Sequence, residues 1–117
     1  MILKQTVGLP KYSWIVTIYY NIKHIDNIVH DLKEAECSEE RLDQIINFLK
    51  EDSKNTGCIF TNRLLKRSII FICKSTSIGE FINTVEHEKN HLEMHICRAI
   101  GIDPYSEEAA ILSGDIS

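Results

Sequence analysis

The sequence predicts one α+β domain that spans residues 1–117 and contains a small antiparallel or mixed sheet. Three observations support this fold class. A run rich in β-branched and aromatic residues lies near the start, two strand-like runs flank a short basic turn in the middle, and stretches with helical apolar spacing lie between and after them. A chain of this length can bury a modest core without disulfides.

The first strand is expected over residues 13–22, SWIVTIYYNI, where both alternating faces are largely apolar. Such a strand is expected to be covered on both sides. Two amphipathic helices follow, and Ser38 with two glutamates after it is a typical start for the second one. Their apolar residues recur at helical spacing: Ile25, Ile28, Val29 and Leu32, then Leu42, Ile45, Ile46 and Leu49.

A β-hairpin is predicted next, with strands over about residues 58–64 and 67–73. The helix after it is expected to begin at Ser77, which forms a capping-box pattern with Glu80, and to end at Gly101. Its apolar arc, the expected core face, comprises Phe81, Ile82, Val85, Leu92, Ile96, Ala99 and Ile100.

A short C-terminal helix is expected to begin at Asp103 and Pro104 and to run to Gly114. The predicted order is therefore strand, two helices, hairpin, long helix and short helix.

Charge and composition argue against several classes of partner. Thirteen basic and seventeen acidic side chains are scattered and give a net charge of −4, which does not suit nucleic-acid binding. No apolar window approaches the length of a membrane span or of a signal peptide. The four cysteines form no CxxC pair, so we expect free thiols and a cytoplasmic location, with extracellular disulfide pairing as the alternative.

The long helix carries the motif HExxH as HEKNH, residues 87–91. His87 and His91 are separated by about 40° around the helix and about 6 Å along it, so both imidazoles can bind one ion. Glu88 is turned by about 100° from His87 and remains free to act as a general base. The alternative is a solvated helix face that happens to carry these polar residues.

A catalytic zinc ion normally has a third protein ligand. His95 lies about 12 Å from His87 along the axis, too far to share the ion, and is expected to support the site or to face solvent. Glu107 and Glu108 in the SEEAA run are the two candidates. Alternatively, both glutamates only interact with the dipole of a helix N-terminus.

These features resemble the zincin metallopeptidases, in particular minimal gluzincins of the ImmA/IrrE-like compact type. The resemblance covers about residues 67–114, which would hold the metal site. It comprises SIIFIC as an edge strand, the HExxH helix and an ExxA segment at Glu107. It implies Zn²⁺ bound by His87, His91 and Glu107, with Glu108 as the alternative third ligand. Asn90 departs from the glycine that many relatives carry there, and the interval from His91 to Glu107 is short.

The resemblance implies a peptide or protein substrate that pairs with strand 67–73. Zinc would activate a water molecule, and Glu88 would transfer its proton to the leaving amine. Tyr105 and His95 are candidates for stabilising the oxyanion. Two alternatives are a non-catalytic zinc-binding or interaction domain with a zincin-like fold, and a metal-free adaptor that binds a partner through the helices within residues 25–53.

Overall fold

The structure is a computed structural model that describes residues 3–20, 26–51 and 53–101. Its strands and helices follow one another along the chain in an order close to the predicted one. They are β1 (Leu3–Leu9), a 3-10 turn (Pro10–Tyr12), β2 (Trp14–Tyr20), α1 (Asp26–Glu34), α2 (Glu39–Lys50), β3 (Gly57–Asn62), β4 (Arg67–Ile72) and α3 (Ile78–Ile100). The predicted short C-terminal helix lies outside the described residues.

The four strands form one mixed sheet in the order β1-β2-β4-β3. β1 pairs antiparallel with β2, β2 pairs parallel with β4, and β4 pairs antiparallel with β3. This arrangement confirms the predicted α+β class. It also shows that the assignment of SIIFIC as an edge strand was wrong, because β4 is bonded on both sides and β3 occupies the edge.

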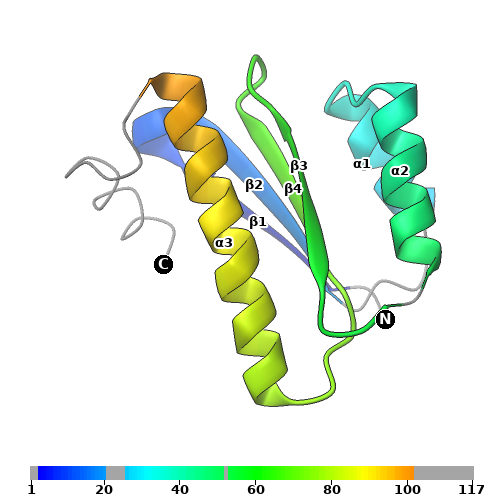
Figure 1. The fold of residues 1–117 in the computed structure, drawn as a ribbon. Coiled ribbons are helices and arrows are strands. Elements are labelled where there is room, and N and C mark those ends of the chain that lie inside the picture. Colours follow the sequence, from blue (N-terminus) through cyan, green and yellow to red (C-terminus); the bar gives the residue numbers. More distant parts are fainter. Residues whose placement is uncertain (1–2, 21–25, 52, 102–117) are drawn as a thin grey trace.

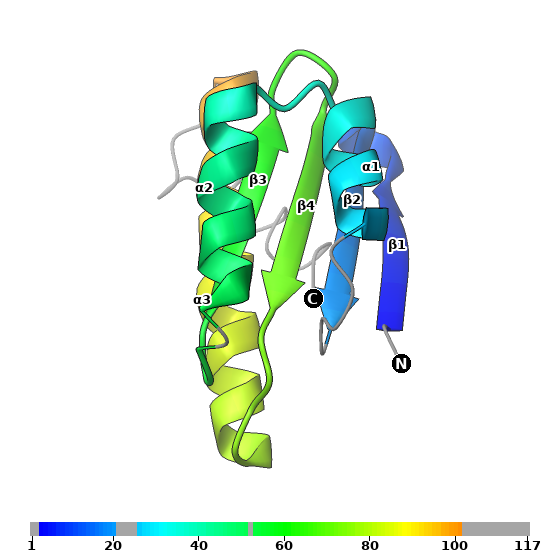
Figure 2. The same cartoon turned by 90° about the vertical axis from the view of Figure 1, so that its right-hand side faces the viewer.

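Helices cover both faces of the sheet. α1 and α2 lie on one face and α3 lies on the other, as Figures 1 and 2 show. Each face has its own apolar core. The core beneath α3 includes Trp14, Val16, Ile70, Ile72, Leu92 and Ile96, and the core beneath α1 and α2 includes Tyr19, Ile28, Leu32, Ile45, Ile69 and Phe71. The prediction that the first strand is covered on both faces is thus confirmed.

Local capping sets the limits of the helices as predicted. The Ser38 hydroxyl accepts a hydrogen bond from the Arg41 amide at 3.2 Å, and the Ser77 hydroxyl accepts one from the Glu80 amide at 3.1 Å. Each bond satisfies a backbone donor that the first helical turn leaves free. Gly101 ends α3 in the left-handed conformation, with φ of 76°.

Two features differ from the prediction. Strand β1 was not predicted, because its sequence LKQTVGL has weak alternation and is stabilised by pairing along its whole length with β2. The expected core face of α3 was also partly wrong, since Phe81 and Ile82 are 38% and 54% exposed. Figure 1 shows the reason: the first turns of α3 extend past the sheet. The buried stripe is Thr84, Glu88, Leu92, Ile96 and Cys97.

Candidate functional site

α3 presents the two motif histidines side by side on its exposed surface. The Nε2 atoms of His87 and His91 lie 3.0 Å apart, and their rings meet at 86° with centroids 4.5 Å apart. Two nitrogen ligands of one tetrahedral zinc ion, each at 2.0–2.1 Å, are separated by about 3.3 Å. The pair lies within hydrogen-bond distance and also has nearly the spacing that a shared ion requires.

Glu88 differs from its neighbours because its side chain is directed at the sheet. It is 3% exposed, and its Oε2 atom is buried without a hydrogen-bond partner. Burial raises the pKa of this carboxyl, and the smaller effects of His91 and His87 oppose that shift. A buried carboxylate without a partner is costly, and such groups are concentrated at functional sites.

Gly57 on β3 makes room for the Glu88 side chain. A β-carbon at this position would lie 3.2 Å from Glu88 Cγ and 3.4 Å from its Oε1. It would also lie 2.6 Å from the Phe71 carbonyl oxygen, a distance that real structures do not show. The absence of a side chain at Gly57 thus allows α3 and β3 to come together at Glu88.

An open hollow of about 100 Å³ borders Glu88. It lies between α3 and the sheet and is lined mainly by apolar side chains, among them Val16, Ile72 and Leu92. Glu88 and Lys89 are the charged residues in its lining. The Glu88 carboxyl thus lies at the boundary between an apolar space and the exposed histidine pair.

His95 is anchored to the sheet and is not a solvent-facing residue. Its Nδ1 lies 2.7 Å from the Thr61 hydroxyl, which lies 2.8 Å from the Ser68 hydroxyl. The Trp14 indole donates to the same Ser68 oxygen at 3.0 Å. Burial, together with nearby positive groups, lowers the pKa of His95 and so favours the neutral form of its imidazole. This hydrogen-bond chain favours a supporting role.

The remaining predicted site residues, Tyr105, Glu107 and Glu108, lie outside the described residues. The third ligand stays a prediction.

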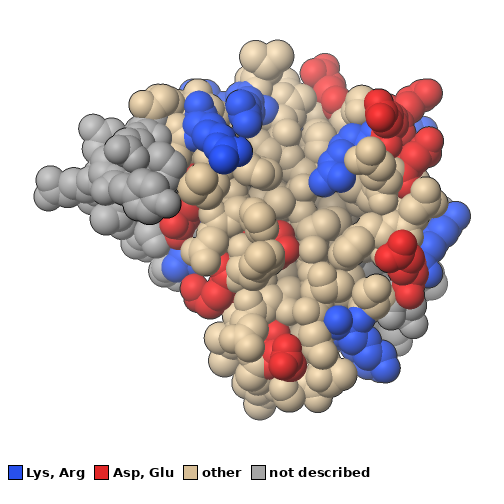
Figure 3. Space-filling view, in the orientation of Figure 1, with Lys and Arg blue, Asp and Glu red and all other residues tan. Residues whose placement is uncertain are grey.

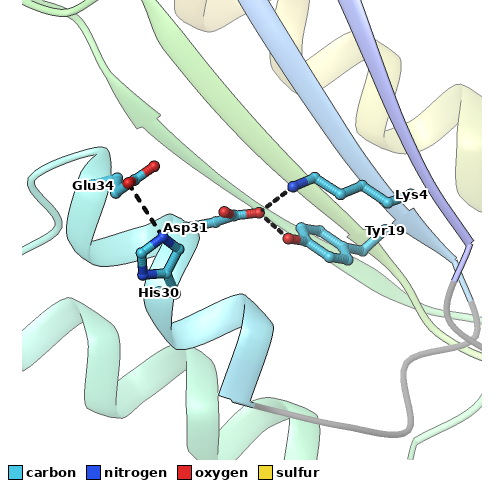
Figure 4. Close-up of polar contacts among 5 residues, drawn as sticks. All are labelled: Lys4, Tyr19, His30, Asp31 and Glu34. Carbon is cyan, nitrogen blue, oxygen red and sulfur yellow. Dashed lines mark hydrogen bonds and ion pairs between the residues drawn. The ribbon is translucent and has the colours of Figure 1, made fainter.

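A second group of candidate metal ligands, His30, Asp31 and Glu34, has ligand atoms within 4.8 Å of one another. Figure 4 shows that these groups already have protein partners. Asp31 accepts hydrogen bonds from Lys4 Nζ at 2.8 Å and from the Tyr19 hydroxyl, while His30 and Glu34 pair at 3.2 Å. Burial raises the pKa of Asp31, but the hydrogen bonds from Lys4 and Tyr19 outweigh this effect and lower the pKa below its ordinary value. This group is an ion-pair cluster that joins α1 to the sheet.

Sequence reasoning did not identify Gly57, Thr61 or Arg41 as neighbours of the site. Arg41 extends from α2 to β3, where its Nη2 donates to the Ile59 carbonyl at 3.1 Å. No local pattern marks these residues, because their positions depend on how β3 is placed beside α2 and α3.

Comparison of the chain with protein-family models gave no match, and comparisons with curated proteins and with solved structures gave none either. Within the described ranges, no helix combines the length and apolar character needed to cross a membrane. Function is therefore inferred from the geometry of α3 and of the elements that contact it.

Proposed function

We propose that the protein is a small zinc-dependent metallopeptidase in which His87 and His91 bind the metal and Glu88 is the general base. One observation carries this proposal. A buried carboxylate, one oxygen of which has no hydrogen-bond partner, lies next in sequence to an exposed imidazole pair whose Nε2 atoms are 3.0 Å apart. The donor set of two imidazoles suits zinc.

The burial of Glu88 argues against an ordinary polar helix face. On such a face the glutamate would be in solvent beside the histidines, whereas Glu88 is 3% exposed. A structural role would require a partner for its buried oxygen, and leaving that oxygen unpaired costs about 1–3 kcal/mol. A role in proton transfer explains why the carboxylate is there.

The third ligand in this proposal is Glu107, by its resemblance to the ExxA segment of compact zincins, with Glu108 as the alternative. Zinc held by these groups would polarise the carbonyl of the substrate and lower the pKa of a bound water molecule. Glu88, whose pKa burial raises above its ordinary value, is suited to accept a proton and to return it to the leaving amine.

The free edge of β3 is the candidate platform for substrate, in place of the predicted strand 67–73. The Cys73 amide donates to the Thr56 carbonyl at 2.9 Å, which makes this a hydrogen-bonded pair of the antiparallel ladder. Because bonded pairs alternate with non-bonded ones, the backbone groups of Gly57, Ile59 and Thr61 point to the free edge. An extended peptide added there would run alongside α3.

Zinc binding by the untagged, metal-free protein tests the metal assignment. We expect one zinc ion per chain in calorimetric titration, with binding lost in His87→Ala and retained in the control His30→Ala. Glu107→Gln and Glu108→Gln, compared singly, identify the third ligand. Equal effects of these two changes would contradict the assignment of one glutamate as a ligand.

Turnover tests the catalytic assignment. Glu88→Gln should retain zinc and lose peptide hydrolysis, because it removes the base without removing a ligand. Full activity in Glu88→Gln would refute the role of Glu88. Zinc binding by a wild-type protein that cleaves no peptide in a degenerate library would instead favour a non-catalytic zinc-binding domain.

A further inference from the structure

Three arginines lie around one end of the β3 edge. Arg41 on α2 donates from Nη2 to the Ile59 carbonyl at 3.1 Å and from Nη1 to Gln44 Oε1 at 3.2 Å. Arg63 lies in the turn between β3 and β4, and Arg98 lies in the last turn of α3. Figure 3 shows basic side chains gathered over the end of this face where α3 ends.

These arginines have no acidic partner in the described part of the chain. The ion pairs Lys4–Asp31 and His30–Glu34, for example, include no arginine. All three guanidinium groups contribute to lowering the pKa of His95, after burial and His91, so their positive charge acts on the same small region. Uncompensated charge of one sign favours a ligand of the other sign.

The order of contacts along β3 places this charge relative to the proposed site. Gly57 lies against Glu88, the Ile59 carbonyl accepts from Arg41, and Thr61 lies against His95. A peptide that pairs with the β3 edge at the level of Glu88 therefore meets Arg41 about two residues, or about 7 Å, farther along. Arg63 and Arg98 follow at the same end.

We propose that Arg41 selects peptides with an acidic side chain about two residues from the position at Glu88, and that Arg63 and Arg98 extend this preference. The proposal rests on the proposed function, which makes the peptide on β3 the substrate. A backbone amide of the added peptide strand must donate to the Ile59 carbonyl, so the peptide displaces the Arg41 guanidinium from this carbonyl. A peptide carboxylate compensates for the lost bond, because charge-assisted hydrogen bonds are stronger than neutral ones.

Peptide binding to the zinc-loaded Glu88→Gln protein tests this selection without turnover. The probes are two blocked eight-residue peptides, one of alternating Val and Glu and the other of alternating Val and Gln. NMR titration should shift the amides of Gly57, Ile59 and Thr61. The Glu peptide should bind at least about tenfold more tightly, the ratio that one charge-assisted bond supplies.

The matched variant is Arg41→Gln, which can still donate to the Ile59 carbonyl but lacks the charge. It should lose most of the preference for the Glu peptide, and the dispersion of its spectrum shows whether it is folded. The control Lys33→Ala removes one positive charge from α1 and should retain the preference. Equal affinity of the two peptides, or an unchanged preference in Arg41→Gln, would overturn the proposal.

A single-stranded oligonucleotide serves as a second probe for general attraction of anions. Binding as tight as that of the Glu peptide would overturn the proposal, since a peptide-specific site requires the β3 edge. The metal-free protein is titrated in parallel. A preserved acid preference together with absent zinc binding would refute the metallopeptidase and leave the selection by Arg41 intact.

Discussion

Replacing the buried Glu88 by methionine should stabilise the metal-free protein. The carboxylate is 3% exposed, and one of its oxygens has no hydrogen-bond partner. Methionine has a similar length, is a good helix former and needs no polar partner. The neighbouring hollow is lined by apolar residues such as Ile72 and Leu92, which suit a thioether side chain.

The expected gain follows from the cost of the unpaired oxygen. Burying a polar group without a hydrogen bond costs about 1–3 kcal/mol, and more when the group is charged. We therefore expect the free energy of unfolding to rise by about 1–3 kcal/mol in Glu88→Met. For a domain of this size, each 1 kcal/mol raises the melting temperature by roughly 3–5 °C.

Urea unfolding at neutral pH, with a chelator present, measures this difference. The control is Glu86→Met on an exposed position of the same helix, where the change should stay within about 0.5 kcal/mol. A Glu88→Met protein that is no more stable than the control would show that the carboxylate finds a partner in solution. A gain would show that stability is sacrificed at this position for function.

Two further predictions concern the packing around the site and the ion-pair cluster, and both are measured by urea unfolding. Gly57→Ala should lower the free energy of unfolding by about 1–3 kcal/mol, because its β-carbon would lie 2.6 Å from the Phe71 carbonyl oxygen. In the control Gly79→Ala the nearest atom to the new β-carbon lies 3.8 Å away, so this change should not destabilise the protein. A Gly57→Ala protein as stable as the wild type would refute the close approach. Asp31→Asn should lower the free energy of unfolding by about 1–3 kcal/mol at pH 7, because it removes the carboxylate that Lys4 pairs with. The Lys4 bond lowers the pKa of Asp31, so its stabilisation is fully present at pH values above the ordinary pKa of an aspartate and disappears as pH falls through the folded-state pKa. The difference from wild type should therefore shrink below about pH 4, and a difference independent of pH would contradict this assignment.

The helices could be predicted from the sequence because their signals are local. Apolar spacing gives the buried faces of α1 and α2 and part of that of α3, and Ser38, Ser77 and Gly101 mark ends that the structure confirms. Strand β1 has no comparable signal, since its Gly8 and polar residues become a strand only by pairing with β2. Pairing partners far apart in sequence cannot be read from a local pattern.

The position of each strand in the sheet also depends on distant contacts. β4 is interior and pairs in parallel with β2, which agrees with its continuous apolar run, since strands buried on both faces lack alternation. Such a run is typical of a central strand, yet the resemblance placed SIIFIC at an edge, and the predicted hairpin gave no reason to place a parallel neighbour beside it. The substrate platform was consequently assigned to β4 when β3 forms the edge.

The candidate site was predictable to the extent that it lies on one helix. His87 and His91 come together because of helical spacing alone. The burial of Glu88 could not be predicted, since it depends on which stripe of α3 faces the sheet. Arg41 and Gly57 approach the site through the placement of α2 and β3, which no motif encodes.

The hydrogen-bond chain from Trp14 through Ser68 and Thr61 to His95 has a consequence for how α3 sits on the sheet. Apolar side chains would tolerate rotation of a helix about its axis or a slide along it, because their contacts have no direction. A hydroxyl bonded to one ring nitrogen does have a direction, and a turn of α3 by one residue would break it. The Thr61–His95 bond thus selects the one orientation in which Glu88 faces inward and both remaining imidazoles face outward.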